Sequence, residues 1–534
     1  MPNDCITYQT SGYFTKLITD YLDEKEEVKS LYNRFPTIEN FKHQIEEKEK
    51  NFNTDGSFKR QILVSELEKQ YFNFNVSQST LNNIKLLNQS NTFTITTGHQ
   101  LNLLTGPLYF IYKIISTINL CKELKTNYPE NNFVPIYWMA TEDHDFQEIN
   151  HFNFKNTKIK WNRESLGSVG RLSTEGLDLV FEQFSKEIEL GENASFLKNI
   201  FENSYLNHSN LADATRFLAN ELFKNEGLVI LDGDSIDLKK LFIPYIKKEL
   251  LEQSSFTNVT KTNSLLENYF VQVNPREINL FYIENNLRER IIFENGIYKI
   301  NNTAIHFTES EILTEIENHP EKFSPNVITR PLYEEVILPN LCYIGGGGEI
   351  AYWLELKSNF EENNITFPML LLRNSVLLAT QKQVEKADKL NLSWADLFSK
   401  QQELLDKKTK DFSSFTIDFS KQKEHLKKQF EELYNIANQT DKSFVGAVKA
   451  QEKKQLNGLE NLEKRLLKAE KRVHKDQLER ILLLQNELFP NQSLQERKMN
   501  FSEFYSEIND YNSFISKIIE QLNPLENKFN IIII

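Results

Sequence analysis

Polar and glycine residues gather in the stretch between residues 96 and 107, which reads TTGHQLNLLTGP. It follows an apolar run typical of a strand and precedes one typical of a helix. A turn from strand to helix presents unpaired backbone N–H groups, and the helix dipole adds positive charge that favours phosphates and carboxylates. A plain structural turn is the alternative, because the stretch fits neither the dinucleotide fingerprint nor the P-loop. The candidate binding residues here are Thr97, Gly98, His99, Gln100, Thr105 and Gly106.

Acidic residues crowd a second stretch, residues 140–151, which reads ATEDHDFQEINH and follows another apolar run. Closely placed carboxylates around a histidine separate each other's pKa values, so they could hold an amine, transfer protons or bind a metal. The alternative is a helix start whose acidic residues suit the dipole. We favour a functional site without a dedicated metal. Its residues are Glu142, Asp143, His144 and Asp145.

A third stretch, residues 330–353, reads RPLYEEVILPNLCYIGGGGEIAYW and contains four of the seventeen glycines in succession. Consecutive glycines let a ligand approach the backbone and let N–H groups converge, at a cost in chain entropy. Arginines can hold carboxylate or phosphate, although each alone is more often a surface ion pair. The candidates are Arg330, Gly345, Gly346, Gly347, Gly348, Glu349 and Tyr352, with Arg373 further along.

Five short apolar strands must position these stretches, with helices between them. They are predicted at residues 92–97, 133–139, 227–232, 341–344 and 368–372. The first two flank one helix, which Pro107 suits in its first turn, and they predict a parallel βαβ unit. The pattern indicates a doubly wound α/β core over residues 91–375, preceded by a mostly helical segment over 1–90.

Two further regions differ from this core in their pattern. Asn295-Gly296 between alternating runs predicts a hairpin, within a partly antiparallel insertion at about 255–325. Residues 376–490 are poor in glycine and carry two heptad-like apolar stripes, which predict a long helical pair, antiparallel or dimerising. The first stripe consists of Leu426, Phe430, Leu433, Ala437, Phe444 and Ala447. We expect a bend or a hairpin near Gly446 or just after. Residues 491–534 should return to the core, with the final NIIII as a terminal strand or simply the end of the fold.

Composition excludes several classes of protein. The 534 residues carry a net charge of −13, which argues against nucleic-acid or membrane-surface binding. No apolar run approaches the ~20 residues that a membrane helix needs. The three cysteines form no pairing motif, which favours a reducing, cytoplasmic location.

Together and in this order, the three stretches resemble those of the cysteine ligases of bacillithiol biosynthesis. The segment FPNQSLQER at residues 489–497 also resembles that family. The resemblance covers essentially the whole chain. It implies a Rossmann-like core related to class I aminoacyl-tRNA synthetases and nucleotidylyltransferases, with a connecting-peptide insertion and a C-terminal coiled coil that supports a homodimer.

The resemblance also implies an activity, the addition of L-cysteine to glucosaminyl-malate. Amide formation needs an activated carboxyl, so we expect ATP with Mg, through an acyl-adenylate or an acyl-phosphate. We assign Lys113, Arg330 and the glycine-containing backbone to negative charge on nucleotide or malate. We assign Asp143, His144 and Asp145 to the cysteine ammonium or the sugar amine. The alternatives are a synthetase-like enzyme for another amine and a non-catalytic coiled-coil scaffold.

Overall fold

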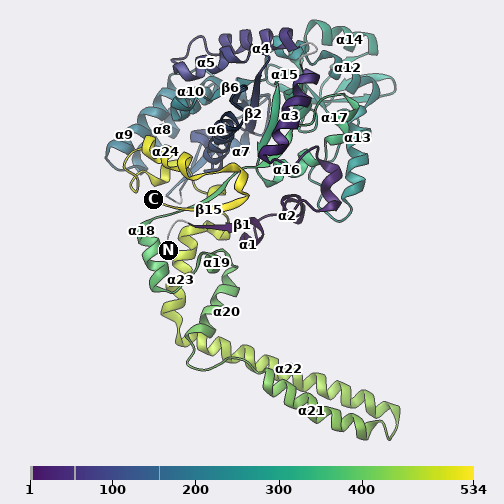
Figure 1. Cartoon of the computed structure of the whole chain (residues 1–534), viewed down its shortest axis with the longest axis vertical. Coiled ribbons are helices and arrows are strands. Elements are labelled where there is room, and N and C mark those ends of the chain that lie inside the picture. Colours follow the sequence, from purple (N-terminus) through teal and green to yellow (C-terminus); the bar gives the residue numbers. More distant parts are fainter. Residues whose placement is uncertain (1–3, 53–55, 156) are drawn as a thin grey trace.

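The chain forms a head and a long helical arm, seen in the computed structural model of Figure 1. The structure describes residues 4–52, 56–155 and 157–534. Both chain ends lie at the base of the head, where the arm begins (Figure 1). Among the described residues, no helix has the length and apolar character needed to cross a membrane.

The centre of the head is a sheet of five parallel strands. They are β2 (Thr92–His99), β3 (Asn132–Met139), β6 (Val229–Asp232), β12 (Asn340–Gly345) and β13 (Met369–Leu372). Numbered along the chain, their spatial order is 3-2-1-4-5, the doubly wound Rossmann-like order. All five predicted strands are therefore confirmed. The order reverses between β2 and β12, where such sheets open a crevice at their carboxyl ends.

Helix α6 (Tyr109–Asn127) connects β2 to β3 and confirms the predicted βαβ unit. It begins two residues after Pro107, whose carbonyl accepts the Phe110 N–H at 3.1 Å, so Pro107 precedes the first turn rather than lying in it. The apolar residues of α6 are buried around most of its circumference, as predicted.

Many other helices surround the sheet. Those before β6 are α1 (Tyr8–Ser11), α2 (Lys16–Leu22), α3 (Ile38–Phe52), α4 (Gly56–Gln70), α5 (Gln78–Leu86), α7 (Phe146–Ile149), α8 (Leu177–Glu187), α9 (Glu192–Phe201) and α10 (Leu211–Phe223). Those between β6 and β13 are α11 (Ile236–Lys240), α12 (Ile243–Glu252), α13 (Ser254–Asn263), α14 (Glu309–Asn318), α15 (Arg330–Ile337), α16 (Gly347–Leu354) and α17 (Lys357–Glu362). The segment before β2 is thus mostly helical, as its sequence indicated.

The insertion forms an antiparallel sheet in the order β10-β9-β8-β7-β11. Its strands are β7 (Leu280–Glu284), β8 (Leu287–Glu294), β9 (Ile297–Ile300), β10 (His306–Phe307) and β11 (Phe323–Pro325). The predicted hairpin is β8–β9. Its turn residues Asn295 and Gly296 have φ of 54° and 81°, as a tight hairpin turn requires. A separate hairpin pairs β4 (His151–Phe154) with β5 (Thr157–Lys160).

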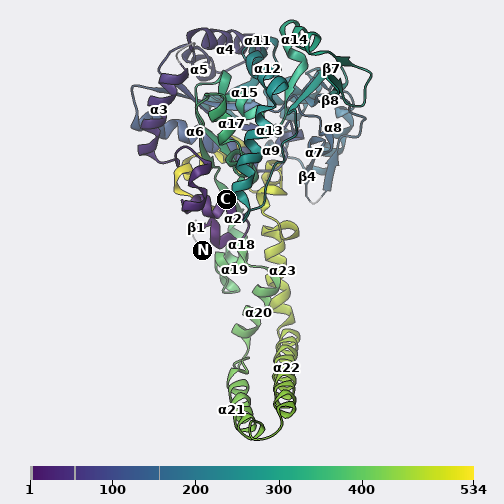
Figure 2. The same cartoon turned by 90° about the vertical axis from the view of Figure 1, so that its right-hand side faces the viewer.

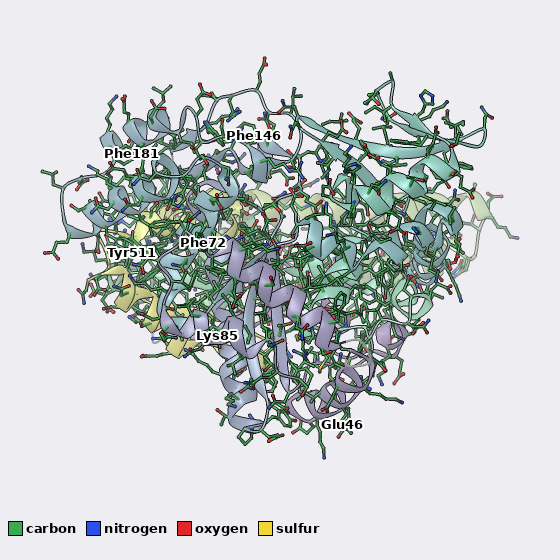
Figure 3. The ribbon with its side chains drawn as sticks, turned by 90° about the horizontal axis from the view of Figure 1, so that it is seen from above. Glu46, Phe72, Lys85, Phe146, Phe181 and Tyr511 are labelled. Atoms are coloured by element: carbon green, nitrogen blue, oxygen red, sulfur yellow. The ribbon has the colours of Figure 1, made fainter. Side chains whose placement is uncertain are left out.

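A third sheet joins the two ends of the chain. The terminal strand β15 (Lys528–Ile533) lies between β14 (Ser375–Ala379) and β1 (Asp4–Thr7). The sequence predicted a strand at the C-terminus but not β1. Seen from above, helix α24 (Tyr511–Gln521) lies beside the region of α8 and α9 (Figure 3), and the Tyr511 and Phe196 rings stack at 5.0 Å. The chain after the arm therefore returns to the head.

The arm is an antiparallel helical hairpin of α21 (Ser420–Ala437) and α22 (Lys442–Val473), which Figure 2 shows turning back at its tip. Its connection to the head consists of α18 (Gln381–Lys389), α19 (Trp394–Phe398), α20 (Gln401–Phe412) and α23 (Lys475–Leu488). The hairpin alternative is confirmed, but the predicted position near Gly446 is wrong, because the turn lies at residues 438–441. Asp441 caps α22 there by accepting the Ser443 N–H at 2.7 Å, and Gly446 lies inside the helix.

Candidate functional site

A cavity of about 880 Å³ opens at the carboxyl ends of β2, β3 and β12, where the strand order reverses. This is where doubly wound sheets bind ligands. Of the predicted site residues, the cavity wall includes Gly98, His99, Gln100, Lys113, Glu142, Asp143, His144, Arg330, Gly346, Gly348, Glu349, Tyr352 and Arg373. The structure thus brings the three stretches together.

The remaining predicted residues lie outside this wall. Thr97 donates its hydroxyl to the Ile344 carbonyl at 2.7 Å and joins two strands. Thr105 and Gly106 lie in a turn with φ of 66° and 64°, conformations that the backbone adopts here to redirect the chain into α6. The part of the first stretch after Gln100 is therefore a structural turn, as its alternative interpretation proposed.

Two glycines of the tetraglycine segment line the cavity and the other two do not. Gly345 ends β12, and a Cβ there would lie 2.9 Å from Glu349 Cβ, so the close turn requires glycine. A Cβ at Gly347 would lie 3.5 Å from the Phe14 ring. Only Gly346 and Gly348 line the cavity, next to the N-terminus of α16.

His99 is buried in the cavity wall between the rings of Tyr109 and Phe110, with centroids 5.4 and 4.9 Å away. Its Nε2 atom has no hydrogen-bond partner among the described residues. Burial lowers the pKa of His99, and the neighbouring Lys113 and Arg373 lower it further. The imidazole is therefore neutral at physiological pH and leaves one ring nitrogen for a ligand.

Lys113 and Glu349 form an ion pair in the wall at 2.5 Å. Lys113 also donates to the Gly98 carbonyl at 2.7 Å, and Glu349 accepts the Gly346 N–H and the Tyr343 hydroxyl, both at 2.9 Å. Burial lowers the pKa of Lys113, although Glu349 opposes this. Burial alone would raise the pKa of Glu349, but Lys113 outweighs it and the net pKa is lowered. The pair and its hydrogen bonds connect the glycine loop to β2.

Two arginines in the wall are held by buried carboxylates. Arg330 donates to Glu334 at 2.5 Å and to the Tyr352 hydroxyl at 3.3 Å. Burial raises the pKa of Glu334 to about 7, with Arg330 acting in the opposite direction. Arg373 donates to both carboxylate oxygens of Glu496, at 3.0 and 2.7 Å. The sequence pattern did not single out Glu334 or Glu496, because their roles depend on contacts that only the fold creates.

The acidic stretch spreads its side chains in different directions. Asp143 accepts the Gln100 side-chain amide at 2.8 Å, and His144 Nδ1 lies 2.6 Å from the Arg288 guanidinium. Glu142 pairs with the buried Lys239. Asp145 instead caps α7, accepting the Glu148 N–H at 3.3 Å, and does not line the cavity. The helix-start interpretation therefore describes Asp145, while the other three face the cavity.

Positive charge predominates in the wall although the chain carries −13. The cationic lining residues are Lys113, Arg276, Arg288, Arg330, Arg373 and Arg497, and the anionic ones are Glu142, Asp143 and Glu349. Arg276, Arg288 and Arg497 were not predicted, since nothing local distinguishes them from surface arginines. Within the described ranges, no group of three or more His, Cys, Asp or Glu side chains is arranged to hold a metal ion.

The parallel sheet, the cavity at its switch point and the helical arm define a Rossmann-like α/β protein with a mainly cationic cavity. Its sequence matches two family descriptions, "Bacillithiol biosynthesis BshC, N-terminal Rossmann-like domain" over residues 1–374 and "Bacillithiol biosynthesis BshC, C-terminal coiled-coil domain" over residues 376–534. The chain belongs to the bacillithiol biosynthesis BshC family.

Its relatives span the full chain. A Flavobacterium psychrophilum protein named "Putative cysteine ligase BshC" is 66% identical over 532 residues, covering 100% of this chain and 99% of its own. The protein of the same name from Flavobacterium johnsoniae is 65% identical over 534 residues, with 100% of each chain covered. The Bacillus cereus (strain AH187) protein of that name is 26% identical over 549 residues, covering 97% of each. The family is therefore shared along the whole chain, arm included.

Proposed function

We propose that this protein joins L-cysteine to glucosaminyl-malate, the last step of bacillithiol biosynthesis, in the cavity at the sheet's switch point. An amide bond would form between the cysteine carboxyl and the glucosamine amine. The names of the full-length relatives support a cysteine ligase. The observation that carries the proposal is the cationic wall of the cavity, because malate, the cysteine carboxylate and nucleotide phosphates are all anions.

We propose ATP with Mg as the activating co-substrate. The residues present fit a polyphosphate. His99 Nε2 and Arg373 Nε are buried polar atoms without a partner among the described residues, and Gly346, just before α16, lies next to Arg373 Nε. Lys113 and Arg330 add positive charge. A cysteine carboxylate oxygen would attack the α-phosphorus of ATP to form an acyl-adenylate and release pyrophosphate, or the γ-phosphorus to form an acyl-phosphate and release ADP.

The amine must then attack the activated carbonyl and lose a proton, while AMP or phosphate leaves. We assign the acceptance of this proton, or the binding of the cysteine ammonium, to Asp143 and His144, which line the cavity shortly after the end of β3. Gln100 and Arg288 orient these two side chains. Asp145 receives no role with the substrate, because it caps α7.

We also propose a homodimer formed through the arm, in a reducing cytoplasm. The hairpin buries Phe430, Ala437 and Val448 between its own helices. It leaves several apolar side chains exposed, namely Leu433, Ile436, Phe444 and Leu462. A second copy could cover them. The three cysteines are free thiols, which suits a reducing compartment.

The direct test incubates the purified protein with L-cysteine, glucosaminyl-malate and ATP-Mg, and follows the cysteinyl product, AMP and ADP by mass spectrometry. Product with AMP supports an adenylate, and product with ADP supports an acyl-phosphate. Binding of the substrates without product would contradict ATP as the activator. If neither cysteine, ATP nor glucosaminyl-malate binds, the scaffold alternative replaces the ligase.

A further inference from the structure

The segment that follows the arm contacts the walls of the cavity. After α23 the chain re-enters the head, and Gln495 exchanges two 2.9 Å hydrogen bonds with the Leu378 backbone in β14. Asn500 donates its side-chain amide to the carbonyls of Leu104 and Gly106, at 2.7 and 2.5 Å, and so holds the turn before α6. Between them, Glu496 reaches Arg373. Residues 495–500 therefore connect the end of the arm to the walls of the cavity.

The contact between Glu496 and Arg373 leaves little freedom to either side chain. Their exposed fractions are 1% and 4%. The Glu496 oxygens also accept the Ser375 hydroxyl at 3.2 Å and the Val376 N–H at 3.1 Å. Two parallel hydrogen bonds between a carboxylate and a guanidinium fix the plane of the arginine as well as its position.

This arrangement determines which part of Arg373 faces a ligand. Both terminal nitrogens donate to Glu496, and one of them also donates to the Asn374 carbonyl at 2.9 Å. The Nε atom remains without a partner among the described residues. A Cβ at Gly346 would lie 3.7 Å from it, so Nε borders the glycine loop of the cavity.

We infer that Glu496 is a positioning residue for Arg373, and that the segment after the arm thereby governs how the cavity holds the negative charge of its substrate. Arg497 follows directly and lines the same cavity. The identity of the substrate rests on the proposed function, whereas the role of Glu496 requires only that Arg373 bind an anion.

A conservative variant tests this inference. Glu496→Asp keeps the charge but withdraws the carboxylate by one methylene, so Arg373 must shift or lose a hydrogen bond. Misplacement by about 1 Å can cost about 100-fold in rate, and we expect kcat/KM for glucosaminyl-malate to fall by up to this factor. Gln495→Ala is the matched control, because it disturbs the same buried segment without touching Arg373. It should lower the unfolding temperature but leave kcat/KM within about threefold of the wild type.

A double-mutant cycle separates positioning from a merely structural role. If Glu496 acts through Arg373, then Glu496→Asp combined with Arg373→Lys should be little worse than the more damaging single variant. Multiplying effects would overturn the inference. So would an unchanged kcat/KM in a folded Glu496→Asp protein.

Calorimetric titration with L-malate and with ATP-Mg keeps the inference testable if the proposed reaction is wrong. A wild type that makes no cysteinyl product but binds either anion, with weaker binding in Glu496→Asp, would refute the reaction and support the role of Glu496. Equal binding by wild type and Glu496→Asp would overturn that role. A wild type that binds neither anion would also overturn it.

Discussion

Removing the charge of Glu349 while leaving Lys113 in place should destabilise the head more than removing both charges together. Lys113 is 3% exposed, and its partners are the Glu349 carboxylate at 2.5 Å and the Gly98 carbonyl at 2.7 Å. In Glu349→Gln the ammonium would keep only neutral acceptors. In Lys113→Met the carboxylate would keep two donors, the Gly346 N–H and the Tyr343 hydroxyl.

The magnitudes follow from this asymmetry. Breaking a buried ion pair from one side costs about 3–5 kcal/mol. The Glu349 side chain is 26% exposed and retains two hydrogen-bond donors. Lys113→Met should therefore lower the free energy of unfolding by about 3 kcal/mol. Because the Lys113 ammonium is more deeply buried, Glu349→Gln should lower the free energy of unfolding by about 4–5 kcal/mol. Replacing a buried pair by neutral side chains is often close to neutral, so the double variant should lose only about 1 kcal/mol.

The pH dependence has a definite sign. Burial already lowers the pKa of Lys113, and Glu349 opposes that shift, so Glu349→Gln lowers the pKa further. A lysine whose folded pKa lies below its unfolded value disfavours folding while protonated. Stability is therefore regained as the pH rises through the folded pKa towards the unfolded value. The stability deficit of Glu349→Gln should therefore shrink as the pH rises towards 10.5, the ordinary pKa of lysine.

Tryptophan fluorescence during thermal unfolding measures this effect in the head, because Trp138, Trp161, Trp353 and Trp394 all lie outside α20–α23. The expected order of midpoints is wild type, double variant, Lys113→Met and Glu349→Gln, from highest to lowest. A double variant that unfolds below either single variant would refute the reasoning, because the charges would then not be coupled. An Asn substitution at Asp441, the distant cap of α22, should leave this transition unchanged.

Three further predictions address the active site, pH and assembly. Asp143→Asn should lower the rate of cysteinyl product formation at least about 100-fold. Asp145→Asn should keep a rate near that of the wild type, because asparagine also caps helices. Equal losses of rate in a mass-spectrometric assay would contradict this prediction. Burial raises the pKa of Glu355 from 4.5 to about 7, so its contribution to stability is present below the ordinary value and lost as the pH rises through about 7. Glu355→Gln should therefore reduce the fall in unfolding temperature between about pH 5 and pH 8, and an unchanged slope would refute the assignment. Leu433→Glu with Ile436→Glu should convert a dimer into a monomer in light scattering, with helix content kept; a variant of unchanged mass would exclude this face.

The strands of the core could be predicted because a strand that is buried on both faces consists largely of apolar and β-branched residues. Each residue of β2 is buried, which makes the pattern continuous rather than alternating. The Asn295–Gly296 turn was equally clear, since both residues must adopt positive φ. Strand β1 was missed because its partner, β15, lies at the other end of the chain.

The arm shows where periodicity misleads. The predicted stripe contained Phe430 and Ala437, which are buried, but also Leu433 and Phe444, which are 42% and 48% exposed. Apolar spacing gave the helices but not the turn, because the turn depends on the Asp441 cap rather than on the glycine at 446.

The site was predictable mainly where polar residues come at or shortly after the end of a strand. Residues 98–100 lie at the end of β2 and residues 142–144 follow β3, and the parallel sheet brings them to one edge. The partners that hold these groups come from elsewhere in the chain. Arg288 arrives from the antiparallel insertion, and Glu496 from the segment after the arm. No local pattern could indicate such contacts.

The net charge of the chain was a poor guide to the charge of the cavity wall, and the origin of the cationic residues explains why. The cations arrive separately, from α6, the insertion, α15, the residue after β13 and the segment after the arm. None of these regions has more than two adjacent basic residues, and the chain carries −13. Charges inside a concave, partly dry wall act more strongly on a ligand than solvated charges outside it, because salt and water screen the latter. The net negative charge that argues against nucleic-acid binding is therefore compatible with a site selective for small anions. On the inference above, that site also depends on residues 495–500, which follow the arm and contact the cavity walls.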